Sequence, residues 1–371
     1  MDAKKNVEHT SISIPEPSKN RLPNAIDMSV SFFQRHIFFV LSTALLSSFI
    51  VFTSFSRRAG VSFLDDLTNG MPERGQLGLG RFEIYGVTYP FEYPFRLAVS
   101  TIPSVWTPWV CFIVHQLGQW YILFTAKQAK QRGELNWTPE DTWNPYAQAM
   151  LKLNVVMILL HYLQTQVFYD GLAASFPEIS TLFAGVSSIL VGFVFEIRRR
   201  GLIFGWTPAT GTDTLFEFTK VLKEYHGYLA SFGIVLTFWY HCMESTFAHW
   251  TGFIHIFLLL WQSSLLYQQQ HKNRYWTLLL EMWILLHGSV VAYYQGILDG
   301  ALYLMFLTSF TLLFLMGPMW GIPFVQEWLA NGNKVVRRNA LLYGSLGWFA
   351  YFSISKFAEN NTLKWSFLIV A

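Results

Sequence analysis

The sequence predicts an all-α protein: a polytopic transmembrane helical bundle of about nine spans, with the N-terminus in the cytoplasm and the C-terminus outside. Three observations predict this class. Only 13% of the 371 residues are charged and 52% are hydrophobic, whereas soluble domains carry about 25% charged residues. Apolar runs of roughly 20 residues, long enough to cross a bilayer as a helix, recur along nearly the whole chain. The basic residues, finally, gather in alternate loops.

Each predicted span is an apolar run bounded by polar or turn-forming residues. A polar tail at 1–32 precedes the first run, which we interpret as a retained helix and not as a cleaved signal. The expected spans are 33–56, 97–126, 146–169, 178–197, 226–243, 250–269, 275–296, 299–317 and 339–357. They form one transmembrane domain over 33–357, followed by a short tail at 358–371. The extracytoplasmic loop at 57–95 is rich in Gly, Pro and aromatic residues and is expected to cap one face.

The positions of the basic residues predict the orientation. The segments that face one side of a nine-span bundle all carry Lys or Arg: Lys4, Lys5, Lys19, Arg21, Lys127, Lys130, Arg132, Arg198, Arg199, Arg200, Lys220, Lys223, Lys272, Arg274, Lys334, Arg337 and Arg338. The short loops 170–177, 244–249 and 297–298 face the other side and contain neither residue type. Because basic loops stay in the cytoplasm, the N-terminus is expected there.

One outer turn concentrates ionisable side chains in an apolar region. The stretch WYHCMESTFAHWTGFIH contains His241, His249 and His255 and joins the fifth span to the sixth. The third and seventh spans bring His161 and His287 to similar depths, because each lies roughly 13 Å from its outer helix end at 1.5 Å per residue. Ionisable residues within a membrane face a bundle interior or a wet cavity. We therefore expect a histidine-rich funnel that opens to the exterior.

These five histidines are the candidate metal ligands, because imidazole suits zinc, iron and several other divalent metals. Glu244 and Asp170 border the same side and are the candidate catalytic residues, as proton acceptors for a metal-activated water. The spacings match none of the recognised histidine metal boxes. Hydrogen bonds between helices and caps at helix ends therefore stay open as structural alternatives.

Three functions are compatible with this constellation. The first is a membrane enzyme that uses a divalent metal, zinc or iron, on a lipid-like substrate. The second is a cation or proton transporter or channel, because ionisable residues in a membrane also mark such pathways. The third is a b-type haem protein with two axial histidines, for example His161 and His287. The expected partners are the lipid bilayer and the lipid-like substrate, and nothing indicates nucleic-acid binding.

Other polar residues in the spans have structural interpretations. His115 lies mid-membrane in the second span, where a core histidine with its hydrogen bonds satisfied and a site histidine both fit. Glu281 in the seventh span is expected to pair with Lys152, at comparable depth in the third. Cys111 and Cys242 lie in or beside apolar runs, so a disulfide framework is not expected.

The stretches LLHYLQTQVFYDGLA (159–173), FEIRRRGLIFG (195–205) and the longer one over 240–296 resemble a group of bacterial multi-pass membrane proteins of unassigned function. In that group the third stretch reads roughly H-P-M-E-x-T-x-G-H-x-x-G-F. The residues that fit are His241, Met243, Glu244, Thr246, His249, Gly252 and Phe253, whereas Cys242 and Ala248 depart from the pattern. The resemblance implies no activity. We expect a bacterial inner-membrane location, and a fainter similarity is to the eukaryotic transmembrane-protein-forty-five type.

Overall fold

The computed structural model describes most of the helical part of the chain. The described residues are 25–54, 81–84, 87–90, 93, 95, 97, 100–139, 142–175, 180–181, 183–185, 187, 191–192, 194, 200–201, 203–206, 213–295 and 301–359. The side chains of 25–38, 81–90, 213–216, 292–306 and 356–359 lie outside this description. So do the first 24 residues of the predicted N-terminal tail, most of the predicted loop 57–95, much of the predicted span 178–197 and nearly all of the predicted tail 358–371.

The described residues are mainly helical, which confirms the predicted all-α class. The helices are α1 (Ala25–Thr53), α3 (Ile102–Gln131), α4 (Pro145–Val167), α6 (Asp213–Tyr240), α7 (Phe247–Ser264), α8 (Arg274–Gln295), α9 (Ala301–Met316), α10 (Pro318–Gly321), α11 (Pro323–Ala330) and α12 (Lys334–Glu359), with the short 3-10 helices η1 (Leu172–Ala174) and η2 (Gln269–Lys272). Strands β1 (Arg81–Ile84) and β2 (Val87–Pro90) form an antiparallel pair in which Arg81 faces Pro90. Eight of the nine expected apolar runs coincide with a long helix.

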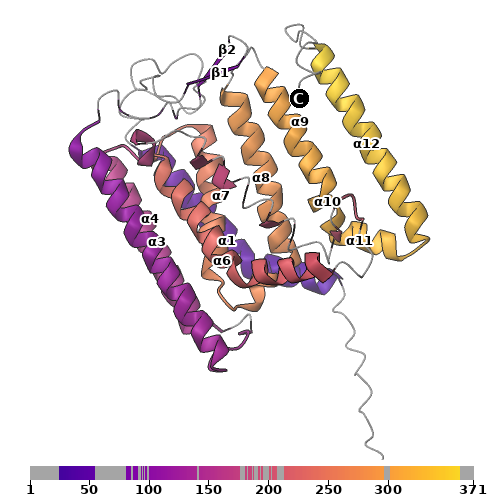
Figure 1. Cartoon of the computed structure of the whole chain (residues 1–371), viewed down its shortest axis with the longest axis horizontal. Helices are drawn as coiled ribbons and strands as arrows, with labels where there is room; N and C mark the ends of the chain where they lie inside the picture. The colour runs from indigo at the N-terminus through magenta and orange to yellow at the C-terminus, as the bar shows by residue number, and fades with distance from the viewer. Residues whose placement is uncertain are drawn as a thin grey trace, which may run out of the picture.

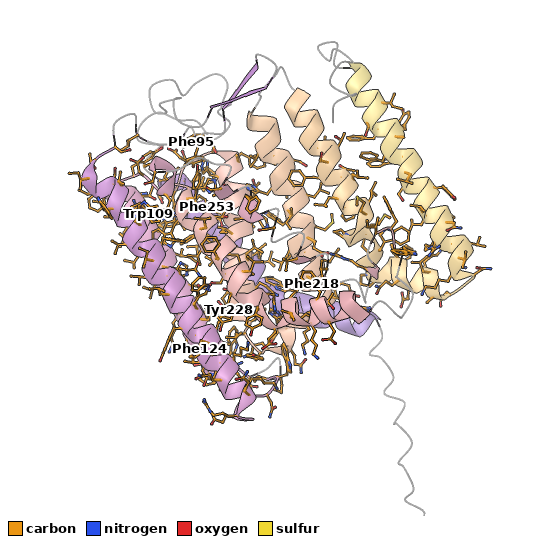
Figure 2. The ribbon with its side chains drawn as sticks, viewed as in Figure 1. Phe95, Trp109, Phe124, Phe218, Tyr228 and Phe253 are labelled. Carbon is orange, nitrogen blue, oxygen red and sulfur yellow. The ribbon has the colours of Figure 1, made fainter. Side chains whose placement is uncertain are left out.

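The long helices lie side by side and run between two ends of the molecule (Figure 1). The strand pair and the end of α12 lie at the upper end in this view, and α11 lies toward the lower end. Helix α3 packs against α4 and α6, and α7 packs against α1, α4, α6 and α8. Helices α9 and α12 extend this group on the side of α8. Figure 2 shows Phe95, Trp109 and Phe253 near the upper end and Phe124, Tyr228 and Phe218 near the lower end.

Length and composition by themselves single out few helices as membrane spans. Helix α4 is long and apolar enough to cross a membrane. The pair Leu307–Gly321 and Pro323–Ala330 passes the same test together, with a 62° bend between its halves, and Phe39–Thr53 is a shorter apolar helix. Helices such as α3 and α8 contain several His, Gln, Trp and Tyr residues, which lower their mean hydropathy.

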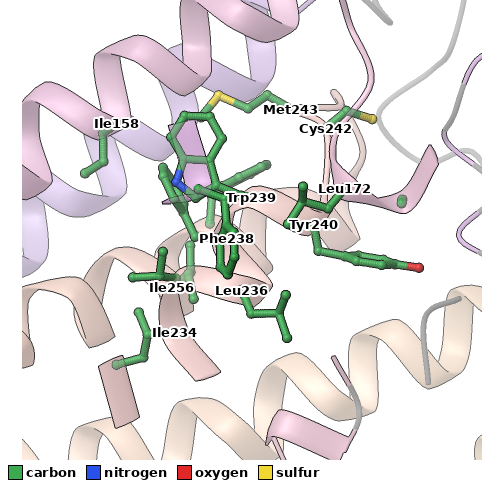
Figure 3. Close-up of a cluster of buried hydrophobic side chains, with 14 of the residues drawn as sticks. Ile158, Leu172, Ile234, Leu236, Phe238, Trp239, Tyr240, Cys242, Met243 and Ile256 are labelled. Carbon is green, nitrogen blue, oxygen red and sulfur yellow. The ribbon is translucent and has the colours of Figure 1, made fainter. Parts of the chain in front are cut away.

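Large apolar side chains form the main core beneath the upper end of the helices. Figure 3 shows Phe238 and Trp239 from the end of α6 and Met243 from the turn that follows. They lie with Leu172 from η1 and Ile158 from α4. Trp239 and Met243 have no exposed surface. Since burying a side chain of this size contributes about 1.5–3 kcal/mol, this cluster fixes the upper ends of α4, α6 and α7 relative to one another.

The sequence also marks where these helices begin. Thr101 caps α3 in a reciprocal pair with Ser104, and the Asn144 side chain accepts a hydrogen bond from the Ala147 amide at the start of α4, at 2.8 Å. Thr246 accepts from the His249 amide at 3.2 Å and caps α7. A cap of this kind stabilises a helix by about 1 kcal/mol. The Thr246 cap also fixes the first turn of α7, where His249 lies.

Candidate functional site

Three segments meet over the upper ends of α4, α6 and α7: the chain around 93–97, the turn after α4, and the turn between α6 and α7. The Tyr93 hydroxyl is hydrogen-bonded to Nε2 of His249. Cys242 donates its thiol hydrogen to the Phe95 carbonyl at 2.7 Å. The chain that follows the strand pair therefore lies across the α6–α7 turn, which holds several of the predicted site residues.

This arrangement corrects the prediction of an open funnel. Asp170 and Glu244 have no exposed surface, and His249 is 8% exposed. The aromatic rings of Tyr93 and Phe95 lie against His249, with ring centroids 5.8 and 4.7 Å away. The described outer carboxylates are thus covered and do not line an entrance. Tyr93 and Phe95 belong to the loop 57–95 that was expected to cap one face, but the apolar pattern did not indicate that it would cover these carboxylates.

Asp170 anchors the start of α3. Its Oδ1 accepts a hydrogen bond from the Leu97 amide at 2.8 Å, and its Oδ2 accepts one from the Ser104 hydroxyl at 3.0 Å. A carboxylate near the first turn of a helix also interacts favourably with the helix dipole. These contacts are those of a structural residue, and the catalytic role expected for Asp170 stays a prediction.

Glu244 lies in the α6–α7 turn and accepts a hydrogen bond from the Tyr169 hydroxyl. Tyr169 follows α4 with a φ of 76°, a left-handed conformation that costs a non-glycine residue about 1–2 kcal/mol. Next to it, Gly171 approaches α6 so closely that a Cβ would overlap the Tyr240 carbonyl oxygen. The strained turn brings the Tyr169 phenol to Glu244, and strain of this kind clusters at functional sites.

His161 is buried on α4 against the end of α6. Its Nε2 donates to the His241 carbonyl oxygen at 2.8 Å, and its ring lies 4.6 Å from the Trp239 ring. Because a carbonyl oxygen only accepts, the proton is on Nε2, and Nδ1 carries a lone pair. Among the described residues, this buried Nδ1 has no hydrogen-bond partner.

His241 directly follows α6, and its two ring nitrogens have the opposite roles to those of His161. Its Nδ1 donates to the Thr237 carbonyl oxygen at 3.0 Å, one helical turn earlier. The same argument places the proton on Nδ1 and leaves the lone pair on Nε2. The edge of the ring packs against Tyr93 and Tyr240, at 4.8 and 5.0 Å between centroids.

His287 on α8 is oriented by α7. Its Nδ1 lies 3.2 Å from the Thr251 hydroxyl, which itself donates to the Ala248 carbonyl oxygen at 3.0 Å. The single hydroxyl hydrogen of Thr251 can serve either acceptor, so Nδ1 of His287 is the donor, with the lone pair on Nε2, when the hydroxyl donates to Ala248. The ring lies over Gly252, where a Cβ would come within 2.8 Å of Cε1. A larger residue at this position would therefore displace the His287 ring.

His255 and His287 form a pair between α7 and α8, with ring centroids 5.7 Å apart. Nε2 of His255 is buried and has no partner among the described residues. His249, by contrast, has both ring nitrogens in hydrogen bonds, Nδ1 with the Thr246 hydroxyl at 2.6 Å and Nε2 with Tyr93.

The five predicted histidines lie near one another, and we call them the histidine row: His161, His241, His249, His255 and His287. His249 interacts electrostatically with both His241 and His287, His287 also with His255, and His161 with His241. Within the part of the chain that the structure describes, no group of three or more His, Cys, Asp or Glu side chains is placed to hold a metal ion.

A second polar cluster lies below the row and was missed by the sequence analysis. His115 donates from Nε2 to Asn154 Oδ1 at 2.9 Å and accepts at Nδ1 from the Trp239 indole at 3.1 Å. The Asn154 amide donates to the Leu260 carbonyl and the Ser264 hydroxyl, both at 2.9 Å. His115 is therefore a core histidine whose ring nitrogens both have partners.

Two glutamines and a serine extend this cluster to α6. Gln119 donates to Asn154 at 2.8 Å and accepts from the Ser231 hydroxyl at 2.7 Å, and Gln116 donates to Ser231 at 3.1 Å. The cluster thus connects α3, α4, α6 and α7, and we call it the Asn154 network: His115, Gln116, Gln119, Asn154, Ser231 and Ser264. In the sequence, the signal that could have revealed this network is the presence of isolated amide side chains in apolar runs.

Other polar residues find partners that the sequence analysis did not name. Glu281 forms a buried ion pair with Arg200, while Lys152 is exposed, so the expected Glu281–Lys152 pair is wrong. Arg200 comes from a segment far away in the sequence, which spacing within helices cannot reveal. Gln262, at helical spacing from His255, instead contacts Nδ1 of His271 at 3.1 Å.

No protein-family model, curated protein or solved structure matches the chain. The resemblance to bacterial multi-pass membrane proteins and the fainter eukaryotic similarity therefore stay predictions.

Proposed function

We propose that the chain is a multi-pass integral membrane protein in which the histidine row takes up and relays protons, as a gated proton transporter. The first support is the outer surface of the helices. One face of α3 exposes an apolar stripe at helical spacing: Ile102, Trp106, Val110, Ile113, Leu117, Tyr121 and Phe124. Soluble monomers rarely expose patches of this extent. A stripe along the first 23 of the 30 residues of α3 suits acyl chains.

Other helices support the same environment. Helix α4 exposes Val155, Leu159 and Leu163, and α12 exposes Tyr343, Trp348 and Tyr351. Four polar residues of α3 and α4, by contrast, lie inside the bundle in the Asn154 network: His115, Gln116, Gln119 and Asn154. Apolar outside and polar inside is the arrangement that a bilayer favours. With nine spans, the alternation of basic loops places the N-terminus in the cytoplasm and the row in the outer half.

The observation that carries the relay is the hydrogen bonding of three imidazoles. His161 and His241 each donate from one ring nitrogen to a carbonyl oxygen and keep a lone pair on the other, and His287 binds the Thr251 hydroxyl through Nδ1. Such an imidazole accepts a proton on one side and releases one from the other, which is the chemistry of a proton shuttle. Because His161 and His249 are buried between helices and the other three histidines are partly buried, the proton moves within protein and not along lipid.

The ends of the row define the route. Tyr93 contacts His249 at the outer end. At this end, Tyr169 from the turn after α4 also donates to Glu244 in the α6–α7 turn. At the inner end, the Trp239 ring lies against His161 and its indole donates to His115. An indole N–H donates but does not accept, so Trp239 interrupts the route in this conformation. We therefore infer a gated carrier and not an open channel.

Flux measurements test the relay. Purified protein in liposomes with a pH-sensitive dye inside should admit protons when a potassium diffusion potential drives them, and His287→Gln should lose about 100-fold, the usual contribution of a positioned proton-transfer group. His226→Gln, midway along α6 and outside the row, is the matched control and should retain flux. Equal flux in protein-free and protein-containing liposomes would refute the proposal. Reporter fusions after each helix test the nine spans separately.

A metal-dependent membrane enzyme is the second candidate, and one observation favours it. Metal-binding histidines usually donate their other ring N–H to a carbonyl or carboxylate, which fixes the tautomer. His161 and His241 donate to carbonyl oxygens in this way. Elemental analysis separates the candidates, because stoichiometric zinc or iron that is lost in His255→Ala and His287→Ala and kept in His271→Ala supports the enzyme. A metal-free preparation with proton flux supports the relay.

A further inference from the structure

We propose that the end of the molecule opposite the histidine row binds the phosphate group of an anionic phospholipid, between Lys130, Lys272 and the ring of Trp137. The inference rests on the proposed membrane topology but is independent of the relay. Lys130 lies in the last turn of α3, Trp137 in the loop that follows, and Lys272 in η2 between α7 and α8. The site therefore lies where two helix connections meet.

The two connections are held together by backbone hydrogen bonds. The Thr138 amide donates to the Tyr267 carbonyl at 2.9 Å, and the Gln269 amide donates to the Thr138 carbonyl at 3.0 Å. Leu135 is buried against the end of α3. The Trp137 ring lies 5.5 Å from the Tyr267 ring. A fixed platform costs little further ordering when a ligand binds.

Both lysines are held on this platform by neutral groups. The Lys272 ammonium lies 3.2 Å from the centroid of the Trp137 ring, and the Lys130 ammonium lies 3.4 Å from Oδ1 of Asn136. Burial and the nearby Lys130 ammonium both lower the pKa of Lys272. Two ammonium groups that repel each other across one surface would be stabilised by an anion between them.

Neighbouring carboxylates do not supply that anion. Glu134 is bound by Arg132 at 2.8 Å, and Glu224 by Lys127 at 2.8 Å. Among the described residues, neither Lys130 nor Lys272 forms an ion pair with a carboxylate. Glu134 and Glu224 are thus matched to other basic residues, and the Lys130–Lys272 pair remains available to an external anion.

The environment favours a lipid phosphate over a soluble one. Trp and Tyr are enriched at the level of lipid headgroups, and Trp137 and Tyr267 lie beside the two lysines. Basic sites between helices on the cytoplasmic side are typical binding sites for anionic headgroups. The proposed topology places this end in the cytoplasmic leaflet.

Lipid binding to the full chain tests the site. Protein in phosphatidylcholine nanodiscs is titrated with phosphatidylglycerol, and the bound lipid is counted by native mass spectrometry. Lys130→Gln and Lys272→Gln should each weaken binding about five-fold, because one basic residue near an anionic surface contributes about 1 kcal/mol. Lys223→Gln, an exposed lysine on α6 at the same end, is the matched control and should bind as the native chain does.

Several outcomes overturn the proposal. Equal loss in all three variants would indicate a general surface charge, and no preference for phosphatidylglycerol over phosphatidylcholine would exclude the site. Competition by inorganic phosphate at equal concentration would identify a soluble anion as the ligand. A protein that enters neither type of nanodisc would instead contradict the membrane topology. Circular dichroism of each variant confirms that it is folded.

Discussion

The histidine row and the Asn154 network are polar clusters that share α4, α6 and α7, yet their hydrogen bonding differs. In the network, both ring nitrogens of His115 and both ends of the Asn154 amide have partners, and among the described residues only Oε1 of Gln116 has none. In the row, Nδ1 of His161 and Nε2 of His255 are buried without one. A satisfied network rigidifies a core, whereas an unsatisfied buried nitrogen is costly and calls for a functional reason. We infer that the network maintains the helix packing and the row performs the chemistry.

Replacing Asn154 by leucine should produce the largest change in stability. The two amide hydrogens are shared among Leu260, Ser263 and Ser264, and the amide oxygen accepts from His115 and Gln119. At about 0.6 kcal/mol for each of four hydrogen bonds between membrane helices, the loss is about 2 kcal/mol. Unfolding in mixed micelles with increasing dodecyl sulfate measures it.

The matched control for this substitution is Val156→Leu, two residues further along α4. Val156 is 50% exposed. The control should leave the unfolding midpoint unchanged. If Asn154→Leu is as stable as this control, the network contributes no helix packing, and the contrast with the row disappears.

His161→Gln should have the opposite profile. The substitution removes one hydrogen bond, to the His241 carbonyl, so the free energy of unfolding should fall by less than about 1 kcal/mol. Proton flux should fall about 100-fold, because glutamine does not exchange protons at neutral pH. Flux and stability are measured on the same preparation.

His115→Gln completes the comparison, since it changes a histidine of the network. It should lower stability more than His161→Gln does, while flux stays within about two-fold once the folded fraction is accounted for. A loss of flux in His115→Gln as large as in His161→Gln would mean that the two clusters act as one site.

The apolar runs predicted the helices well because burial in lipid or in a core demands the same long apolar segments. They also predicted that the five histidines would lie together, since equal depth on neighbouring helices leaves few alternatives. The Asn154 network was missed because one amide in an apolar run does not reveal which neighbours it will face. The cover formed by Tyr93 and Phe95 and the Arg200–Glu281 pair depend on loops, whose paths follow from packing and not from periodicity.

Gly252→Ala tests how strictly the row is positioned. The added Cβ would lie 2.8 Å from Cε1 of His287, so the ring must move. Overpacking of this kind costs about 1–3 kcal/mol, and we expect flux to fall by about ten-fold because proton transfer depends on hydrogen-bond distance. Gly344→Ala in α12 is the control, because its Cβ meets nothing within 4 Å. Native flux in Gly252→Ala would show that the orientation of His287 is unimportant.

The smallest effect at neutral pH is expected from His271, a partnered histidine outside the row. Burial and the nearby His226 lower the pKa of His271 from its ordinary 6.5 to about 4. The unfolded chain therefore binds a proton below pH 6.5 that the folded protein refuses, and stability falls as the pH drops from 6.5 toward 4. Relative to the native chain, His271→Gln should gain about 2 kcal/mol at pH 5 and nothing at pH 7.5, with proton flux unchanged. Unfolding midpoints at both pH values measure the difference. If proton flux also changed in His271→Gln, His271 in η2 would have to be counted among the histidines that carry protons.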